Sequence, residues 1–284
     1  MAEKKVLENP ILAGMVVPLA VVLVAALLIF GVSKLLTPER NHTELVRELK
    51  AKRFGNRWIA AYELSKLIAA SRIPPADEPA LIDDLTELYE SSKDPRTKKF
   101  LVMAASALKN PKKIDLIAKA TQDPIRDIKF HAIVALANVD KGLKPNLDSL
   151  KEIIKNPEQD DHGLLQASIL GLTHHVTPEA NKDIRKFLDH PNFKVQMAAA
   201  SGLINYRDEL ARNKISKILL GTPEFFADNG INQEEVKAVE VNMLAAIGKA
   251  SWKGLRPLVA KVRKQDNDIK VHAKAAEILD LFKM

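Results

Sequence analysis

Apolar and polar positions recur in a nine-residue pattern between residues 56 and 279. In seven windows the ninth position is Leu, the sixth is apolar, and the fifth is Ala or Ser in every window but one. The windows are residues 56–64, 100–108, 128–136, 164–172, 195–203, 236–244 and 271–279. Positions five, six and nine lie on one face of an α-helix, because residues three and four apart are neighbours there. The pattern predicts seven helices that approach one another closely through small residues and a leucine.

The sixth window breaks the pattern. Glu240 stands at the fifth position, where the other windows have Ala or Ser, and residues 221–232 interrupt the spacing before it. The register of this helix therefore stays open.

A second, more charged amphipathic segment precedes each window. These segments are residues 42–53, 79–90, 112–121, 147–155, 182–188, 212–220 and 255–264. Turn dipeptides follow four of them: Asp94-Pro95, Asp123-Pro124, Asn156-Pro157 and His190-Pro191. Asp and Asn can cap a following helix, and Pro fits its first turn. The sequence predicts seven helix–turn–helix units.

Inner helices with the pattern V-x-x-A-A-x-x-A-L after an Asp-Pro turn resemble HEAT repeats. The resemblance is greatest to the short bacterial type that also occurs in bilin-lyase-like proteins, and it covers about residues 41–284. It implies an all-α, HEAT-like αα-superhelix, and it specifies a fold rather than an activity. Each unit of such a stack buries its apolar face only against its neighbours.

The N-terminal segment has a different character. Residues 11–33 carry no charge and lie between Lys5 and Lys34. A helix of about 23 residues spans about 35 Å, which exceeds the hydrocarbon core of a bilayer. The apolar run is longer than that of a signal peptide, and no small-x-small cleavage site precedes Lys34. The expected organisation is a tail at 1–10, a transmembrane helix at 11–33, a juxtamembrane linker at 34–41 and a HEAT-like repeat domain at 42–284.

Basic residues are more numerous after the apolar segment than before it. By the positive-inside rule this predicts a single-pass protein of a bacterial inner membrane, with the repeat domain in the cytoplasm. The net charge of +7 suits an anionic lipid surface or an acidic partner. A membrane span argues against nucleic acid as the partner.

Residues that carry chemistry are sparse. The chain has no Cys, so disulfides, thiolate metal sites and a cysteine nucleophile are excluded. His162 and the His174-His175 pair would lie at opposite ends of one helix, about 18 Å apart, too far to share a metal ion. The sequence also lacks a Gly-rich phosphate loop and a nucleophile elbow. It predicts no catalytic residue, no metal and no cofactor, and a protein that is not an enzyme.

Charge is distributed unevenly along the first repeats. Acidic residues dominate 77–94 and basic residues dominate 96–113. The favoured interpretation is a solvated outer helix beside a basic one, and the alternative is a polarised docking surface.

Apolar side chains also occur at the third and seventh window positions, which point away from the shared face. They are Trp58, Tyr62, Val102, Phe130, Val134, Leu170 and Met197. These residues either form a partner groove on the inner face of the solenoid or belong to helices that are apolar nearly all round. The aromatic pair Phe225 and Phe226 in the interruption is a second candidate contact.

Three functions follow from these features. The first is a membrane-tethered scaffold that binds one or more proteins. The second is an accessory subunit of a larger membrane complex, such as a transporter or a redox assembly, because Gly14, Ala20, Ala25 and Ala26 would let another helix approach closely. The third is a lyase or a glycosylase-like enzyme.

Overall fold

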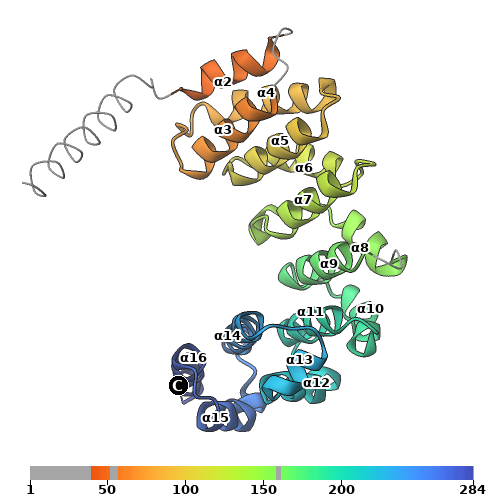
Figure 1. Cartoon of the computed structure of the whole chain (residues 1–284), viewed down its shortest axis with the longest axis vertical. Helices are drawn as coiled ribbons and strands as arrows, with labels where there is room; N and C mark the ends of the chain where they lie inside the picture. Colours follow the sequence, from red (N-terminus) through yellow and green to blue (C-terminus); the bar gives the residue numbers. More distant parts are fainter. Residues whose placement is uncertain (1–39, 52–56, 158–160, 284) are drawn as a thin grey trace, which may run out of the picture.

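The protein is an arc of stacked helical hairpins (Figure 1). A computed structural model describes residues 40–51, 57–157 and 161–283. Within these ranges there are helices and no strands, in agreement with the predicted fold class. The termini of the described chain lie at opposite ends of the arc.

Seven hairpins follow one another in the described part of the chain, each with an outer and an inner helix. The outer helices are α2 (His42–Lys50), α4 (Glu78–Ser91), α6 (Lys113–Ala120), α8 (Asp148–Lys155), α10 (Ala180–Arg185), α12 (Arg212–Leu219) and α15 (Arg256–Gln265). The inner helices are α3 (Arg57–Ala69), α5 (Pro95–Ala107), α7 (Arg126–Ala137), α9 (His162–His174), α11 (Phe193–Leu203), α14 (Gln233–Lys249) and α16 (Ile269–Leu281). From α3 to α9, the inner helices lie on the hollow side of the arc (Figure 1).

Small residues and leucines hold the inner helices together as the pattern predicts. Ala60, Ala104 and Ala132 are fully buried, and the leucines at the ninth position are buried in the first six hairpins. Leu279 is only partly buried, because α16 belongs to the last hairpin and no further described helix covers it.

Helix caps confirm the predicted turns at one dipeptide only. Asp94 accepts the backbone N–H groups of Arg96 and Thr97 and has Pro95 in the first turn of α5. Asp161 caps α9 and Asn192 caps α11 instead of the residues before Pro157 and Pro191. Pro124, Pro157 and Pro191 therefore lie in the turns before α7, α9 and α11 rather than in their first helical turns, and α7 has no side-chain cap.

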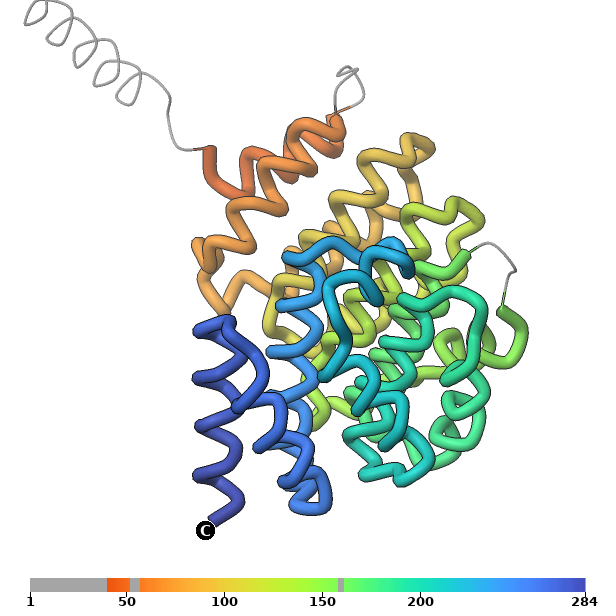
Figure 2. The backbone as a smooth tube through the Cα atoms, turned by 60° about the horizontal axis from the view of Figure 1, so that its bottom comes forward, coloured from red at the N-terminus to blue at the C-terminus, as the bar shows by residue number. Residues whose placement is uncertain are grey.

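An extra helix, α13 (Pro223–Asp228), stands between the two helices of the sixth hairpin. It occupies the predicted interruption, and Phe226 and Ile231 anchor the inserted segment in the core. A capping box between Asn232 and Glu235 then starts α14. Figure 2 shows α13 and α14 side by side near the C-terminal end of the arc.

The buried side chains form two clusters. The N-terminal core runs from Leu45 to Ala132 and the C-terminal core from Ile117 to Phe282. They meet in the third hairpin, where Ala132 belongs to the first and Ile133 to the second.

The charged outer surface consists of ion pairs between neighbouring hairpins. The Lys50 ammonium lies 2.7 Å from Asp84 and the Lys112 ammonium 2.6 Å from Asp83, and Lys119 pairs with Glu90. The acidic helix α4 is thus neutralised by bases on α2 and in the third hairpin. This arrangement favours the solvated outer surface over the polarised docking surface.

The predicted transmembrane helix, residues 11–33, and the tail at 1–10 lie outside the described residues. Among the described helices, none is long and apolar enough to cross a bilayer. The longest, α14, has 17 residues and carries charged side chains. For the part of the chain that the structure describes, this finding points against the predicted localisation, a single-pass inner-membrane protein with a cytoplasmic repeat domain.

Candidate functional site: a groove on the inner face

Two adjoining cavities lie on the hollow side of the arc. The first, of about 740 Å³, is lined by α7, α9, α11 and α14, and the second, of about 440 Å³, by α3, α5 and α7. Val134 and Asn138 line both cavities, so that together they form one continuous depression. We call this depression the inner groove.

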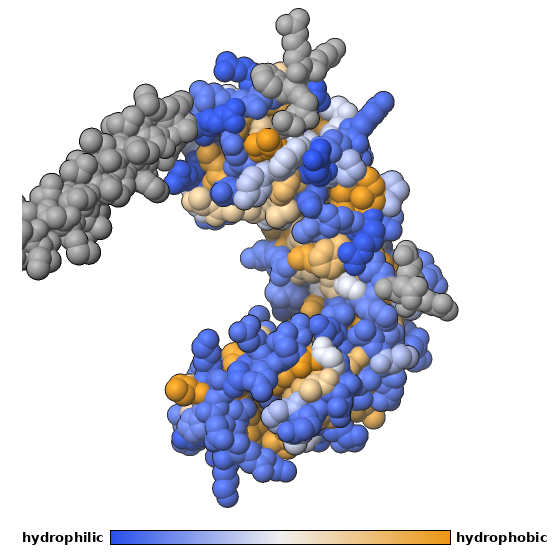
Figure 3. Space-filling model, viewed as in Figure 1, coloured by the Kyte–Doolittle hydropathy of each residue, from blue (hydrophilic) through white to orange (hydrophobic). Residues whose placement is uncertain are grey.

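Exposed apolar side chains give the inner groove its binding character. Tyr62, Met103 and Leu170 are 41%, 37% and 46% exposed, although residues of this kind are normally buried. In the space-filling view the surface is mostly hydrophilic, with hydrophobic side chains reaching it in the hollow of the arc (Figure 3). Exposed apolar groups that gather on one face are typical of a surface that binds a partner.

The charge of the inner groove is positive. Lys66 lines it and lies over the ring of Tyr62, 5.2 Å from the ring centre, and no Asp or Glu occurs among the described residues that line either cavity. Burial lowers the pKa of His131 and of His174, so both imidazoles are neutral at pH 7.

A basic rim borders the groove where the inner helices end. A third depression, of about 820 Å³, shares Ser106, Ala107, Asn138 and His174 with the groove and is also lined by lysines. These are Lys109, Lys113, Lys141 and Lys249, and one acid, Asp140, lies among them. Burial lowers the pKa of Lys113, whose ammonium donates to the carbonyl oxygens of Ser106 and Leu108. The other three ammonium groups project from exposed residues and add positive charge to this edge.

Of the residues predicted from the third and seventh window positions, four line the inner groove. Tyr62, Phe130, Val134 and Leu170 lie there. Val102 and Met197 occupy third positions, as Phe130 does, but they are buried in the core. The structure thus brings together the residues whose helix face points into the hollow.

Trp58 lies in an aromatic cluster beside the groove rather than in its lining. Its ring stacks on Phe100 at 6.4 Å, and the Arg96 guanidinium lies 5.1 Å from the centre of the Trp58 ring. Phe100 also contacts Tyr62, at 5.1 Å. The cluster joins the first two hairpins and positions Tyr62.

Phe225 and Phe226 pack inwards with Phe193. The ring centres of Phe193 and Phe225 are 5.3 Å apart, and Phe226 is 2% exposed. This pair fixes α13 to the stack, and Phe226 lines a separate cavity described below.

Sequence reasoning missed other residues that line the inner groove, among them Met103 and Asn138. Met103 occupies the fourth window position, which shares a helix face with the seventh and eighth. An apolar residue at the fourth window position could therefore have been predicted to line the inner groove. Asn138 ends α7 and its side chain donates to the carbonyl of Val134.

No three of the described His, Asp and Glu side chains are placed to hold a metal ion. The predicted absence of a metal and a cofactor remains a prediction.

The fold is a HEAT-like α-solenoid, and solved structures share it. One of them is a chain in the structure of the complex of CpcE and CpcF of phycocyanin lyase from Nostoc sp. PCC7120. The alignment covers 87% of the present chain and 96% of the lyase chain, at 18% identity and a TM-score of 0.58. YIBA_ECOLI aligns with 84% of this chain and 81% of its own, at 13% identity and a TM-score of 0.51. The predicted resemblance to HEAT-like, bilin-lyase-type solenoids is confirmed for the fold. No protein-family model matches the chain, and no curated protein matches it.

One functional prediction needs correction. The chain was predicted not to be an enzyme, since repeat solenoids without catalytic motifs commonly serve as scaffolds. A chain with this fold forms part of phycocyanin lyase. The inference from a repeat solenoid to a protein that is not an enzyme is therefore wrong, because the same fold occurs in a chain of a lyase.

Proposed function

We propose that the protein is a solenoid scaffold whose inner groove binds an acidic segment of a partner protein that carries apolar side chains. The observation that carries this proposal is the continuous inner groove, in which Tyr62 of α3, Met103 of α5 and Leu170 of α9 are exposed. Burial of these side chains by a partner releases about 25 cal/mol per Å² of apolar surface. Residues 42–284 form the binding domain.

Charge selects the partner. Lys66 lines the inner groove, and Lys109, Lys141 and Lys249 lie at its basic rim. A segment with Asp or Glu on one side and apolar residues on the other would satisfy both surfaces. Electrostatic complementarity of this kind raises the association rate and rejects basic competitors.

The proposal rests on the repeat domain alone and makes no use of the predicted membrane anchor, which lies outside the described residues. The predicted alternative, an accessory subunit of a larger membrane complex, remains a prediction. In that case the inner groove would bind another subunit of the complex.

A second candidate function is a part in a lyase-type enzyme complex. It is favoured by the alignment with 96% of a chain of the phycocyanin lyase complex. It would use the inner groove to hold the protein substrate. A substrate that is bound in the groove and leaves chemically changed would distinguish this candidate from a scaffold.

The test is a selection of displayed random peptides on the full chain. Selected peptides should combine apolar residues with Asp or Glu, and Leu170→Asp should weaken their binding at least tenfold, because it places a carboxylate in the apolar lining. Fluorescence anisotropy with the selected peptides measures this.

Leu210→Asp is the matched control. Leu210 is 66% exposed and lies outside the described lining of the inner groove, so its substitution should leave binding unchanged. Selected peptides that are basic, or that bind the Leu170→Asp chain as well as the wild type, contradict the proposal.

A further inference from the structure

The break in the repeat at Glu240 coincides with a cavity. In the other hairpins the fifth window position is Ala or Ser and is fully buried against neighbouring helices, as at Ala132, Ser168 and Ala199. Glu240 is also buried, with 5% of its surface exposed, and it lines a cavity of about 650 Å³ beneath α13. The inserted helix thus makes room for a side chain that the rest of the stack would exclude.

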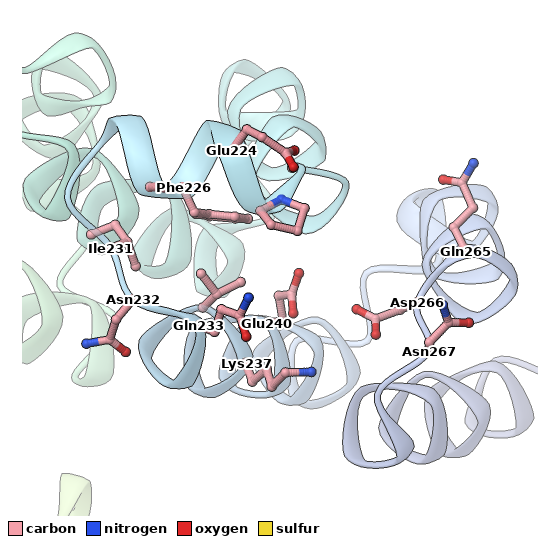
Figure 4. A pocket seen from close by; sticks show the side chains of 14 residues that line it. Glu224, Phe226, Ile231, Asn232, Gln233, Lys237, Glu240, Gln265, Asp266 and Asn267 are labelled. Atoms are coloured by element: carbon pink, nitrogen blue, oxygen red, sulfur yellow. The ribbon is translucent and has the colours of Figure 1, made fainter.

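The carboxylate of Glu240 has no hydrogen-bond donor among the described residues. Figure 4 shows it pointing into the space below Phe226, with Asp266 pointing toward it from the segment after α15. Glu240 as a residue is 5% exposed, and its carboxylate, which borders the cavity, costs free energy there unless a ligand or water satisfies it.

The nearby charges do not neutralise this pair of acids. The Lys237 ammonium lies 2.7 Å from Asp268 and is therefore already paired. Asp266 uses Oδ1 to accept the N–H of Asp268, at 2.7 Å, which leaves its other oxygen for the cavity. Burial, followed by the negative charge of Asp266, raises the pKa of Glu240 to about 7, with Asp268 acting in the same sense and Lys237 in the opposite one.

The remaining walls of the cavity are apolar on one side and polar on the other, where Glu224, Asn232, Gln233, Lys237, Gln265 and Asn267 line it. Pro223, Phe226, Ala227, Ile231 and Val236 face it from α13, the turn after α13 and the start of α14. Its volume is in the range of small-ligand sites. The cavity shares no lining residue with the inner groove, so a ligand here is independent of the proposed partner segment.

We propose that this cavity binds an alkylammonium or alkylguanidinium group, whose cation lies between Glu240 and Asp266 and whose aliphatic part packs on Phe226 and Ile231. A cation there supplies the donors that Glu240 lacks and relieves the repulsion between the two carboxylates. The apolar side of the cavity, at Phe226 and Ile231, favours an aliphatic chain over a hydrated metal ion.

Isothermal titration calorimetry of the full chain with butylguanidinium, butylammonium and butanol tests the proposal. The two cations should bind and butanol should not. Because binding needs the ionised carboxylate, affinity for the cations should fall about eight- to tenfold between pH 8 and pH 6, as Glu240 takes up a proton.

Glu240→Gln should weaken cation binding at least tenfold and remove the pH dependence. Glu234→Gln, on an exposed position of the same helix, is the matched control and should bind like the wild type. Asp266→Asn, which keeps an oxygen for the N–H of Asp268, should also weaken binding and serves if Glu240→Gln does not fold. Equal binding of butanol, no binding of either cation at millimolar concentration, or equal affinity in the wild type and the variant that folds would overturn the proposal.

The cation can belong to a free small molecule or to an Arg or Lys side chain of a protein. A capped Gly-Arg-Gly peptide distinguishes them. Tighter binding of the peptide than of butylguanidinium assigns the cavity to a protein side chain, and weaker binding assigns it to a free ligand.

Discussion

Asp123 shows how single residues connect the hairpins. Its sequence context, Asp-Pro, predicted a helix cap, yet α7 begins at Arg126 and Asp123 is 5% exposed. The Tyr89 hydroxyl donates to Asp123 at 2.6 Å and the Lys98 ammonium at 3.0 Å. Asp123 therefore ties the second hairpin to the turn before α7.

Substitution of Asp123 should be costly. Burial alone would raise the pKa of Asp123, but hydrogen bonds from Tyr89, Ile125 and Lys98 hold it below its usual value. Asp123→Asn should lower the free energy of unfolding by about 2 kcal/mol at pH 7, because it removes a charged acceptor and leaves Lys98 unpaired. Urea denaturation measures this loss.

The effect should depend on pH in one direction. A carboxyl whose pKa is depressed by folding stabilises the protein above its unfolded pKa of about 4, and this stabilisation is lost as the pH falls through the folded value. The difference between wild type and Asp123→Asn should thus shrink at pH 3. The exposed Asp228→Asn is the control, and an equal loss in both variants contradicts the role of Asp123.

At the scale of the helices, the positions that recur in every hairpin could be predicted from the sequence, whereas positions that occur in one hairpin only could not. The buried leucines and small residues follow from a periodic pattern, and all seven hairpins appear where that pattern places them. The buried positions of Val102 and Met197 depend on how much each helix is rotated towards its neighbour. Glu240 could be recognised as a break in the pattern, whereas its cavity depends on the placement of α13, which no periodicity encodes.

Gly171 marks a close approach between helices. A Cβ atom there would lie 2.6 Å from Leu150 Cδ2 and 2.7 Å from Ala137 Cβ. Ala normally stabilises a helix interior by about 1 kcal/mol relative to Gly. Gly171→Ala should instead lower the free energy of unfolding by about 1–3 kcal/mol, because α7, α8 and α9 must move apart.

Thermal and urea denaturation of the purified variant check this sign. Gly163→Ala, in the first turn of the same helix, is the control. Its Cβ would meet the Arg126 guanidinium, the mobile end of a side chain, at 2.9 Å. This variant should be as stable as the wild type, and a stabilised Gly171→Ala would contradict the close approach.

At the scale of the whole molecule, the two cores predict two units of stability. A stack in which each hairpin contacts its neighbours unfolds locally rather than all at once. The N-terminal and C-terminal cores meet in the third hairpin, between Ala132 and Ile133.

Leu85→Ala should separate the two units. Leu85 is fully buried in the N-terminal core, and its truncation should cost about 2–5 kcal/mol there. Hydrogen exchange should accelerate in α2 to α5 and stay unchanged in α11 to α16. Leu244→Ala, in the C-terminal core, should give the reverse pattern, and a uniform acceleration in either variant contradicts the division.

Helix α7 has two tasks in this arrangement. It contains the junction of the two cores, and its residue Val134 lines both cavities of the inner groove. A segment bound along the entire groove would therefore contact both cores across that junction. It would join two independently opening halves into one cooperative body, so that exchange in both halves slows together when the groove is filled.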